Sequence, residues 1–298
     1  MHTDSTRPAL ASHCVHLAIP PGFVFAHTLS FVASFPATRG EQEVRAGALT
    51  KCLSLDGRAV LVSLSSARGS LRLEVRSNRA LTDAAMAELS ARVRFWLSLD
   101  DDLGPFRALA AADAPYAPIA ERWAGHHHVK FPSAFEVAVW AVLGQRSMRA
   151  GRPMKRALVE ALGPTITIDG TTHCAFPEAS RLTDVRVVAS RVPDRARAEA
   201  IVSIAHAFSD PSFERSLLTM PIDAAESELR RLPFLGPWSS AFVLFRGLGR
   251  MERLASASDP ILDAARRVYG AKSERELRAH AASYGAWCGY WALYLRRG

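Results

Sequence analysis

Residues 232–242 read Leu-Pro-Phe-Leu-Gly-Pro-Trp-Ser-Ser-Ala-Phe and join two predicted helices by a tight turn. The first helix is predicted from Ala224 to Arg231, and the second begins at Pro237, since proline is favoured in the first turn of a helix. The start of the second helix exposes backbone N–H groups, which can hold a phosphate without any side-chain charge. Taken alone, such a stretch is more often an ordinary corner between two helices.

Two further motifs give this turn a context. Residues 258–262 (Ser-Asp-Pro-Ile-Leu) follow it, and residues 143–147 (Leu-Gly-Gln-Arg-Ser) come after an apolar helix upstream. Together the three motifs resemble the helix–hairpin–helix DNA glycosylase superfamily, and specifically DNA-3-methyladenine glycosylase II. Residues 193–208 and 287–294 resemble two further helices of that family. The resemblance covers nearly the whole chain, and its most specific part is the turn paired with Asp259.

The resemblance implies that Asp259 is the catalytic residue. Cleavage of an N-glycosidic bond leaves positive charge on the sugar, and a fixed carboxylate beside the sugar stabilises that transition state. An aspartate before a proline is also a common N-cap residue of a helix, and the two roles are compatible.

The resemblance places Trp238 and Phe242 in the pocket that receives the base. Alkylated purines carry positive charge, and a cation over an aromatic face gains about 0.5–2 kcal/mol. The alternative is that both are core residues, because side chains four positions apart share one face of a helix.

Contacts with DNA are implied for two loops. Gln145 and Arg146 match the loop from which the family inserts a residue into the duplex when a base is flipped out. The turn itself is assigned to phosphate binding, through Phe234, Leu235, Gly236, Pro237 and Ser239. The basic residues after the inserting loop either meet phosphates or form a solvated helix face; they are Arg149, Arg152, Lys155 and Arg156.

Lysine is scarce in this chain, and that bears on the reaction. Trp238 occupies the position at which lyase-competent relatives carry a Schiff-base lysine. The only lysines are Lys51, Lys130, Lys155 and Lys272, and none lies in the turn. We therefore expect a monofunctional enzyme that leaves an abasic site without cutting the strand, since no amine is available there to attack the sugar.

Three positions depart from the family pattern. Phe234 replaces the first glycine of the turn, Arg146 stands where the family often has an apolar residue, and Arg296 falls at an aromatic pocket position. These departures leave two alternatives open. The chain could be a catalytically silent helix–hairpin–helix DNA-binding protein, or a glycosylase for deaminated or oxidised bases.

The predicted fold class is α+β. Residues 1–12 are expected to be a flexible tail, residues 13–104 a small α/β sheet domain, and residues 105–298 an all-helical glycosylase domain. Strands are predicted around 60–64 and 71–75, where apolar and polar residues alternate with a period of two. Asp56-Gly57, between Leu55 and Arg58, is a turn signal typical of a hairpin.

The helices follow from spacing and capping. Ser133 and Glu136 fit a capping box, in which each side chain bonds a free amide at a helix start. The helix over 135–143 is apolar almost all round, which predicts a buried central helix. Other helices are predicted near 81–97, 152–162, 194–208, 223–231, 237–248, 260–269 and 274–296.

Composition bounds the class of protein. Hydrophobic residues make up 49% and charged residues 22%, which argues against a mainly disordered chain. The 37 basic residues exceed the 29 acidic ones, giving a formal charge of +8, and this excess favours a polyanionic partner. The four cysteines are scattered singly, which argues against a disulfide framework, a structural zinc site and a four-cysteine iron–sulfur loop. No metal and no cofactor are expected. The run His126–His128 is expected to form a surface loop.

The partner implied by these observations is double-stranded DNA that contains a damaged base. No apolar stretch approaches the length of a membrane span, and no signal-peptide pattern begins the chain, so we expect a bacterial-type cytoplasmic monomer associated with the nucleoid.

Overall fold

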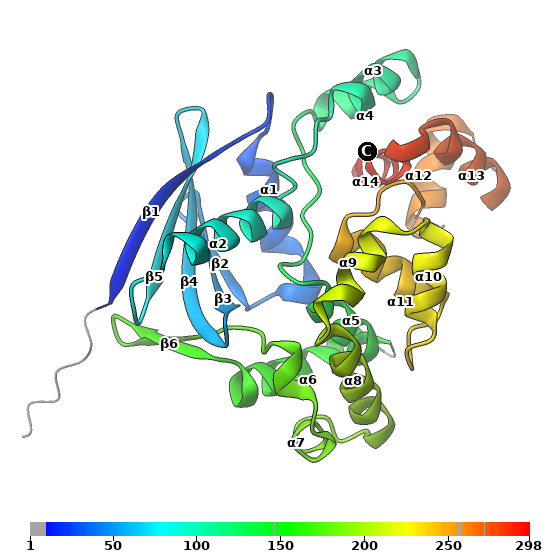
Figure 1. Cartoon of the computed structure of the whole chain (residues 1–298). Coiled ribbons are helices and arrows are strands. Elements are labelled where there is room, and N and C mark those ends of the chain that lie inside the picture. The colour runs from blue at the N-terminus through cyan, green and yellow to red at the C-terminus, as the bar shows by residue number, and fades with distance from the viewer. Residues whose placement is uncertain (1–9, 146, 255–257, 271) are drawn as a thin grey trace, which may run out of the picture.

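The computed structural model describes residues 10–145, 147–254, 258–270 and 272–298. A β-sheet lies on one side of the molecule and most of the helices lie on the other (Figure 1). The predicted α+β class is confirmed by this arrangement. Residues 1–9 of the expected tail lie outside the described residues.

The sheet has five antiparallel strands in the order β1-β5-β4-β3-β2. Leu55 pairs with Arg58 across the turn, and Asp56 and Gly57 have φ values of 50° and 71°. Two successive positive φ values are the geometry of the tight turn that Asp-Gly predicts. The strands are β1 (Ala11–Ala18), β2 (Gln42–Arg45), β3 (Ala48–Leu55), β4 (Arg58–Ala67) and β5 (Ser70–Ser77).

One face of the sheet is covered by α1 (Phe25–Ser34) and α2 (Asp83–Trp96). Leu71, Leu73 and Val75 of β5 are all buried in this layer. Alternate residues of a strand point to one face, so the period of two placed the apolar set against the helices, as predicted.

The other face of the sheet contacts a hairpin that the sequence analysis did not anticipate. It consists of β6 (Thr165–Ile168) and β7 (Thr171–Cys174), and Ile166 forms a small buried cluster with Leu61 of β4. Its turn, Asp169-Gly170, has positive φ at both residues. The Asp-Gly signal of the first hairpin is therefore repeated here. Apart from this hairpin, the described part of residues 105–298 is helical or loop.

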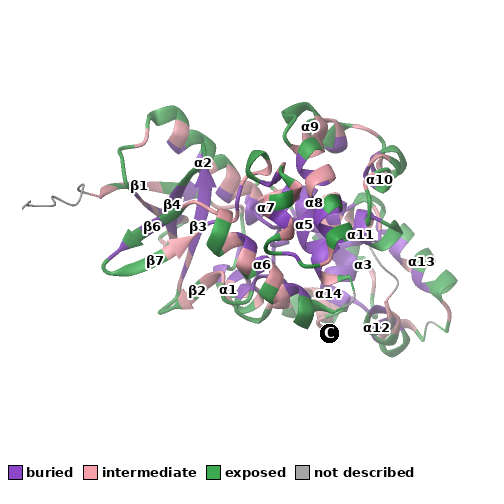
Figure 2. Ribbon diagram, turned by 90° about the horizontal axis from the view of Figure 1, so that it is seen from below, coloured by how far each residue is buried: buried purple, intermediate pink, exposed green. Residues whose placement is uncertain are grey.

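The centre of the helical part is α5 (Ala134–Gly144), which is buried over ten consecutive residues as predicted (Figure 2). Ser133 accepts the amide of Glu136, so this half of the capping box is confirmed. The carboxylate of Glu136 instead contacts Lys155, 2.7 Å away. Around α5 lie α6 (Met148–Leu162), α8 (Arg195–Phe208) and α11 (Pro237–Phe242).

The predicted single helix over 274–296 is wrong. The chain forms α13 (Glu274–Ser283) and α14 (Cys288–Leu295), with Gly285 at a φ of 53° between them. A residue in the left-handed region interrupts the helical hydrogen bonds, and the new direction lets α14 bury its aromatic residues. The remaining helices are α3 (Gly104–Ala112), α4 (Ala117–Arg122), α7 (Val185–Ala189), α9 (Pro211–Thr219), α10 (Ile222–Arg230) and α12 (Asp259–Tyr269).

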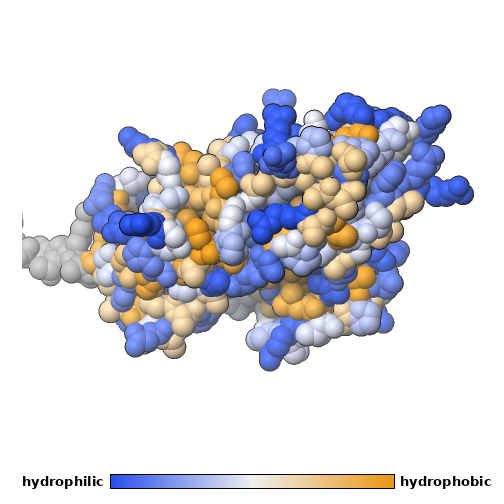
Figure 3. Space-filling model, turned by 90° about the horizontal axis from the view of Figure 1, so that it is seen from above, coloured by the Kyte–Doolittle hydropathy of each residue, from blue (hydrophilic) through white to orange (hydrophobic). Residues whose placement is uncertain are grey.

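The outer surface mixes hydrophilic and hydrophobic side chains, as the view from above shows (Figure 3). Among the residues that the structure describes, no helix has both the length and the apolar character that a membrane crossing needs. The division into domains at residues 104 and 105 stays a prediction; this position coincides with the start of α3.

Candidate functional site

The turn between α10 and α11 and the first residues of α11, residues 231–239, are here called the hairpin. Phe234 has a φ of 64°, in the left-handed region that costs an L-residue about 1–2 kcal/mol. Gly236 has a φ of −74°, and a Cβ added to it would meet nothing within 4 Å. The left-handed conformation that favours glycine therefore occurs at Phe234. The backbone at Gly236 is one that any residue can adopt, and the space beside it is open.

Two of the predicted DNA-contacting residues turn their side chains inward. Leu235 is 2% exposed and Ser239 is 4% exposed. The backbone carbonyl of Leu235 accepts the Ser240 hydroxyl at 3.2 Å, which fixes the hairpin on α11. Contacts from Leu235 and Ser239 to a ligand would therefore use their backbone groups. The N-cap residue of α11 is Gly236, which has no side chain to cap the first turn, and the helix begins at Pro237.

Trp238 and Phe242 form an aromatic stack on α11. Their ring centroids are 5.1 Å apart and their planes differ by 8°. Trp238 is 56% exposed, so the core alternative is wrong for this residue. Phe242 is half-buried against the helical core and contacts Phe131 edge-on at 6.4 Å. The stack thus presents an indole to solvent on a support that is anchored in the core.

The loop before α6, from which insertion into DNA is expected, reaches the hairpin. The Gln145 side-chain amide donates to the carbonyl of Phe234 at 2.5 Å. Arg146 lies outside the described residues. Met148, the first residue of α6, is 51% exposed. Gln145, Phe234 and Met148 therefore bring two distant segments of the sequence to one exposed surface.

Asp259 is the first residue of α12, and its side chain lies outside what the structure describes. The N-cap residue of this helix is Ser258, so the expectation that Asp259 is the cap is wrong by one position. The helix otherwise begins where the Asp-Pro pair predicts it, with Pro260 in the first turn.

A buried cation follows α11, and the sequence analysis missed it. Arg246 lies in a π-helical turn, Val243–Gly247, and donates to the carbonyl of Val129 at 2.8 Å. Its guanidinium carbon is 4.7 Å from the ring centre of Phe31 of α1. Burial, followed by the charges of Arg296 and Arg297, lowers the pKa of Arg246 to about 9. The available signal was a lone arginine in the apolar run 242–248.

The prediction that residues 126–128 form a surface loop is wrong. His126, His127 and His128 are at most 2% exposed, so they do not form a surface loop. His127 bonds the carbonyl of Ser98 at 2.8 Å, and His128 bonds the carbonyl of Phe245 at 3.0 Å. Burial lowers the pKa of all three rings. The rings are neutral imidazoles, and His126 packs between α1 and α14.

Lys155 differs from its basic neighbours, because it points into the protein. Its ammonium group is 2.7 Å from Glu136 and 2.7 Å from Glu41, and its side chain is 1% exposed. Burial alone would lower the pKa of Lys155, but the two carboxylates raise it. Lys155 is therefore a structural cation, and the solvated alternative is wrong for it.

The described residues contain no group of three His, Cys, Asp or Glu side chains placed to hold a metal ion. Two large cavities lie elsewhere. One of about 560 Å³ is bounded by β2, β3, α6 and β7, and another of about 700 Å³ lies near the β3–β4 turn.

Known proteins are similar to this chain in sequence, and others are similar to it in fold. DNA-3-methyladenine glycosylase of Bacillus subtilis is 27% identical over 69% of the chain and 70% of its own length. A probable bifunctional transcriptional activator/DNA repair enzyme AlkA of Mycobacterium tuberculosis is 27% identical over 98% of the chain, which spans 58% of that longer protein. No protein-family model matches the chain.

The fold matches a solved structure of 3-methyladenine DNA-glycosylase from Archaeoglobus fulgidus. The TM-score is 0.76 at 18% identity, with 95% of this chain and 97% of that chain covered. In sequence and in fold the chain resembles one class of proteins, the helix–hairpin–helix DNA N-glycosylases. Within that class, the chain resembles DNA-3-methyladenine glycosylase II.

Proposed function

We propose that the protein releases alkylated, 3-methyladenine-like bases from duplex DNA in base-excision repair. The observation that carries the proposal is the Trp238–Phe242 stack at the hairpin, with its indole 56% exposed. An exposed aromatic face attracts a cationic base more than a neutral one. The similarity to proteins named DNA-3-methyladenine glycosylase supports the same substrate class.

The mechanism assigns each part of the surface a task. The hairpin residues 234–239 bind the DNA backbone, chiefly through main-chain groups, and the open space at Gly236 allows close approach of a phosphate. The inserting loop, with Gln145 and Arg146, fills the place of the flipped nucleotide, which offsets part of the unstacking cost of a few kcal/mol.

The chemistry is assigned to Asp259 at the start of α12. Its carboxylate stabilises the positive charge that develops on deoxyribose as the bond to the base breaks. A methylated, positively charged purine is already a good leaving group, so strong acid catalysis is not required. Water then adds to the sugar, and the product is an abasic site.

We further propose that the enzyme is monofunctional. Lys51 contacts Glu41, Lys155 contacts Glu41 and Glu136, and Lys130 donates to Ser98 at 2.6 Å. These three amines are engaged within the fold, and the hairpin carries a tryptophan instead of a lysine. Borohydride reduction during the reaction should therefore leave no protein covalently linked to DNA.

The direct test of the catalytic role is Asp259→Asn. The neutral amide keeps the size of the side chain and removes the charge that stabilises the sugar cation. We expect release of 3-methyladenine from methylated duplex DNA to fall by a factor of about 100 or more, with binding to abasic-site DNA retained. Full activity of Asp259→Asn would remove Asp259 from the mechanism.

The proposal also includes three properties of the enzyme: it requires duplex DNA, it is a monomer, and it works in the cytoplasm.

A further inference from the structure

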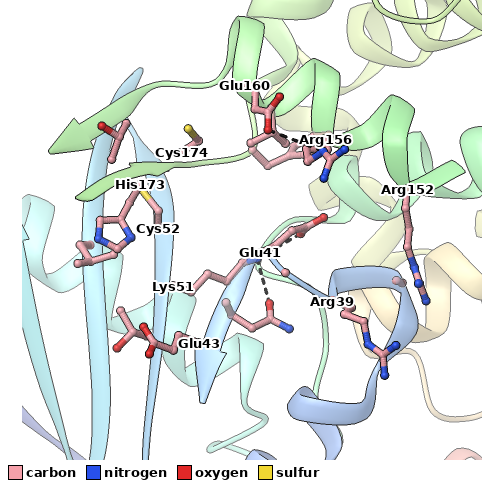
Figure 4. A pocket seen from close by; sticks show the side chains of 18 of the residues that line it. Arg39, Glu41, Glu43, Lys51, Cys52, Arg152, Arg156, Glu160, His173 and Cys174 are labelled. Atoms are coloured by element: carbon pink, nitrogen blue, oxygen red, sulfur yellow. Dashed lines mark hydrogen bonds and ion pairs between the residues drawn. The ribbon is translucent and has the colours of Figure 1, made fainter. Parts of the chain in front are cut away.

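The cleft of about 560 Å³ between the sheet and α6 has a basic edge (Figure 4). Four arginines line it, and we call them the arginine rim: Arg39, Arg149, Arg152 and Arg156. Arg39 follows the short 3₁₀ turn Pro36–Thr38, and the other three belong to α6. None of them is part of the hairpin or of the inserting loop.

The three arginines of α6 share one side of the helix. They are spaced i, i+3 and i+7, so they rise by about 4.5 and then 6 Å along the axis and stay within about 60° of one line. Lys155 falls on the other side, where it is buried against Glu136. One cation of α6, Lys155, therefore forms a buried ion pair, and the other three belong to the rim.

The acidic residues of the cleft are largely neutralised by other groups. Glu41 is contacted by Lys51 and Lys155, and Glu160 pairs with Arg156 at 3.8 Å. Glu43 lies on the strand side of the cleft, away from Arg39 and Arg152 (Figure 4).

Three rim residues keep their charge available. Within the described ranges, Arg39, Arg149 and Arg152 have no carboxylate at ion-pair distance. Arg152 donates its Nε to the carbonyl of Pro36 at 2.9 Å, which holds its guanidinium at the mouth of the cleft. Arg39 and Arg149 are exposed. The rim therefore presents uncompensated positive charge on a fixed scaffold.

The rim continues the surface on which the hairpin lies. Gln145 joins the inserting loop to the carbonyl of Phe234, and α6 begins three residues later at Met148. A DNA strand that leaves the hairpin along α6 would meet Arg149 first and Arg156 last. The span from Arg149 to Arg156, about 10.5 Å, equals the rise of about three nucleotides of one strand.

We propose that the arginine rim binds backbone phosphates of the duplex arm that extends from the lesion along α6. The inference rests on the proposed function for its ligand, and adds a second DNA-binding surface on the seam between the sheet and the helices. Its effect is on affinity and on the length of duplex required, and the chemistry at the sugar is unchanged.

The test uses Arg39→Glu/Arg149→Glu, because both side chains are exposed and neither makes an ion pair that the substitution would break. Arg186→Glu/Arg275→Glu is the charge-matched control, with both residues exposed on α7 and α13. The probe is a duplex that contains a stable abasic-site analogue, prepared with two arms of about 12 base pairs. In two further duplexes one arm or the other is cut to about 3 base pairs, which equals the span of the rim alone and so does not reach from the lesion to its far end.

We expect the rim variant to bind the long duplex at least about ten-fold more weakly than the control, with a salt slope reduced by about 2, since each lost phosphate contact removes about 0.9. Shortening one particular arm should abolish the difference between rim variant and control, and shortening the other should not.

Equal binding of rim variant and control, or a difference that survives truncation of either arm, would overturn the inference. Base release by the unsubstituted protein, measured in parallel on methylated duplex, separates the two proposals. If that release is absent while the arm-dependent effect is present, the proposed function fails and the rim stands. If the unsubstituted protein does not bind the probe, both fail.

Discussion

The ion cluster around Lys155 places charges in the protein interior, whereas the hairpin places an aromatic side chain in solvent. Lys155 and Glu136 are charges removed from water, and they are tolerated because Lys155 lies within ion-pair distance of Glu136 and of the partly exposed Glu41. The hairpin instead exposes an indole and holds Phe234 in a left-handed conformation. The first arrangement serves the fold, because every group is satisfied internally. The second leaves an aromatic face open to solvent, where an external ligand can contact it.

The largest effect is expected from Lys155→Met. It would leave the carboxylate of Glu136, 2% exposed, buried without its main partner. Breaking a buried pair in this way costs about 3–5 kcal/mol, measurable as the free energy of unfolding in urea. The double variant Lys155→Met/Glu136→Leu should recover most of that loss, because it removes both charges. A loss below about 1 kcal/mol in the single variant would show that the cluster is not structurally important.

The buried histidines predict a pH dependence of stability. Burial lowers the pKa of His126 to about 2, and lowers the pKa of His127 and His128 as well. Below pH 6.5 the unfolded chain takes up protons that the folded protein does not, so stability is complete above that pH and falls as the pH drops. The expected slope is up to about 1.4 kcal/mol per pH unit for each histidine.

The matched variant for this test is His126→Leu. It should reduce the slope of the unfolding free energy against pH, between pH 6.5 and 5, by the contribution of one histidine, up to about 1.4 kcal/mol per pH unit. An unchanged slope would contradict the burial of this ring as the cause.

Trp238→Ala tests the hairpin side of the comparison. Because the indole is 56% exposed, stability should change by less than about 0.5 kcal/mol. Release of a cationic methylated base should fall by about ten-fold, the equivalent of the lost cation–π contact. Phe242→Ala is the useful companion, since its ring is half-buried and its loss should lower stability and activity together. A Trp238 variant with unaltered base release would separate the stack from substrate binding.

The smallest effect concerns the two turn positions. Phe234→Gly and Phe234→Ala lose the same aromatic ring, but only glycine relieves the positive φ. The glycine variant should therefore be the more stable by about 0.5–1 kcal/mol, the reverse of their order in a helix. Gly236→Ala is the control, because its φ of −74° and open surroundings predict no strain. If the alanine variant at Phe234 proves the more stable, the left-handed conformation is not maintained in solution.

Local patterns predicted much of the fold. The alternation of apolar and polar residues predicted β4 and β5. The Asp56-Gly57 pair predicted the turn between β3 and β4, and the apolar run predicted α5. The hairpin β6–β7 carried the same signal at Asp169-Gly170, but its strands are short and threonine-rich. The break before α14 depends on Gly285, and a single glycine in a helical pattern is compatible with a continuous helix.

The site could be predicted only where the motif itself defines it. The sequence placed Trp238, Phe242 and the hairpin together, and the structure added the contact from Gln145. The sequence alone could not show that Lys155 is buried while Arg152 and Arg156 line the cleft. The partners of Lys155, Glu41 and Glu136, are remote from it in sequence. Arg246, His127 and His128 were missed for the same reason, since carbonyl groups from other elements satisfy them.

The most direct measurement is the mass-spectrometric identification of free bases after the unsubstituted protein is incubated with methylated duplex DNA. We predict that 3-methyladenine is released, that the strand stays intact until the abasic site is cleaved by alkali, and that unmethylated duplex yields no free base. Tight binding to both duplexes with no base released would contradict the account, and would identify the protein as a DNA-binding member of this fold without catalytic activity.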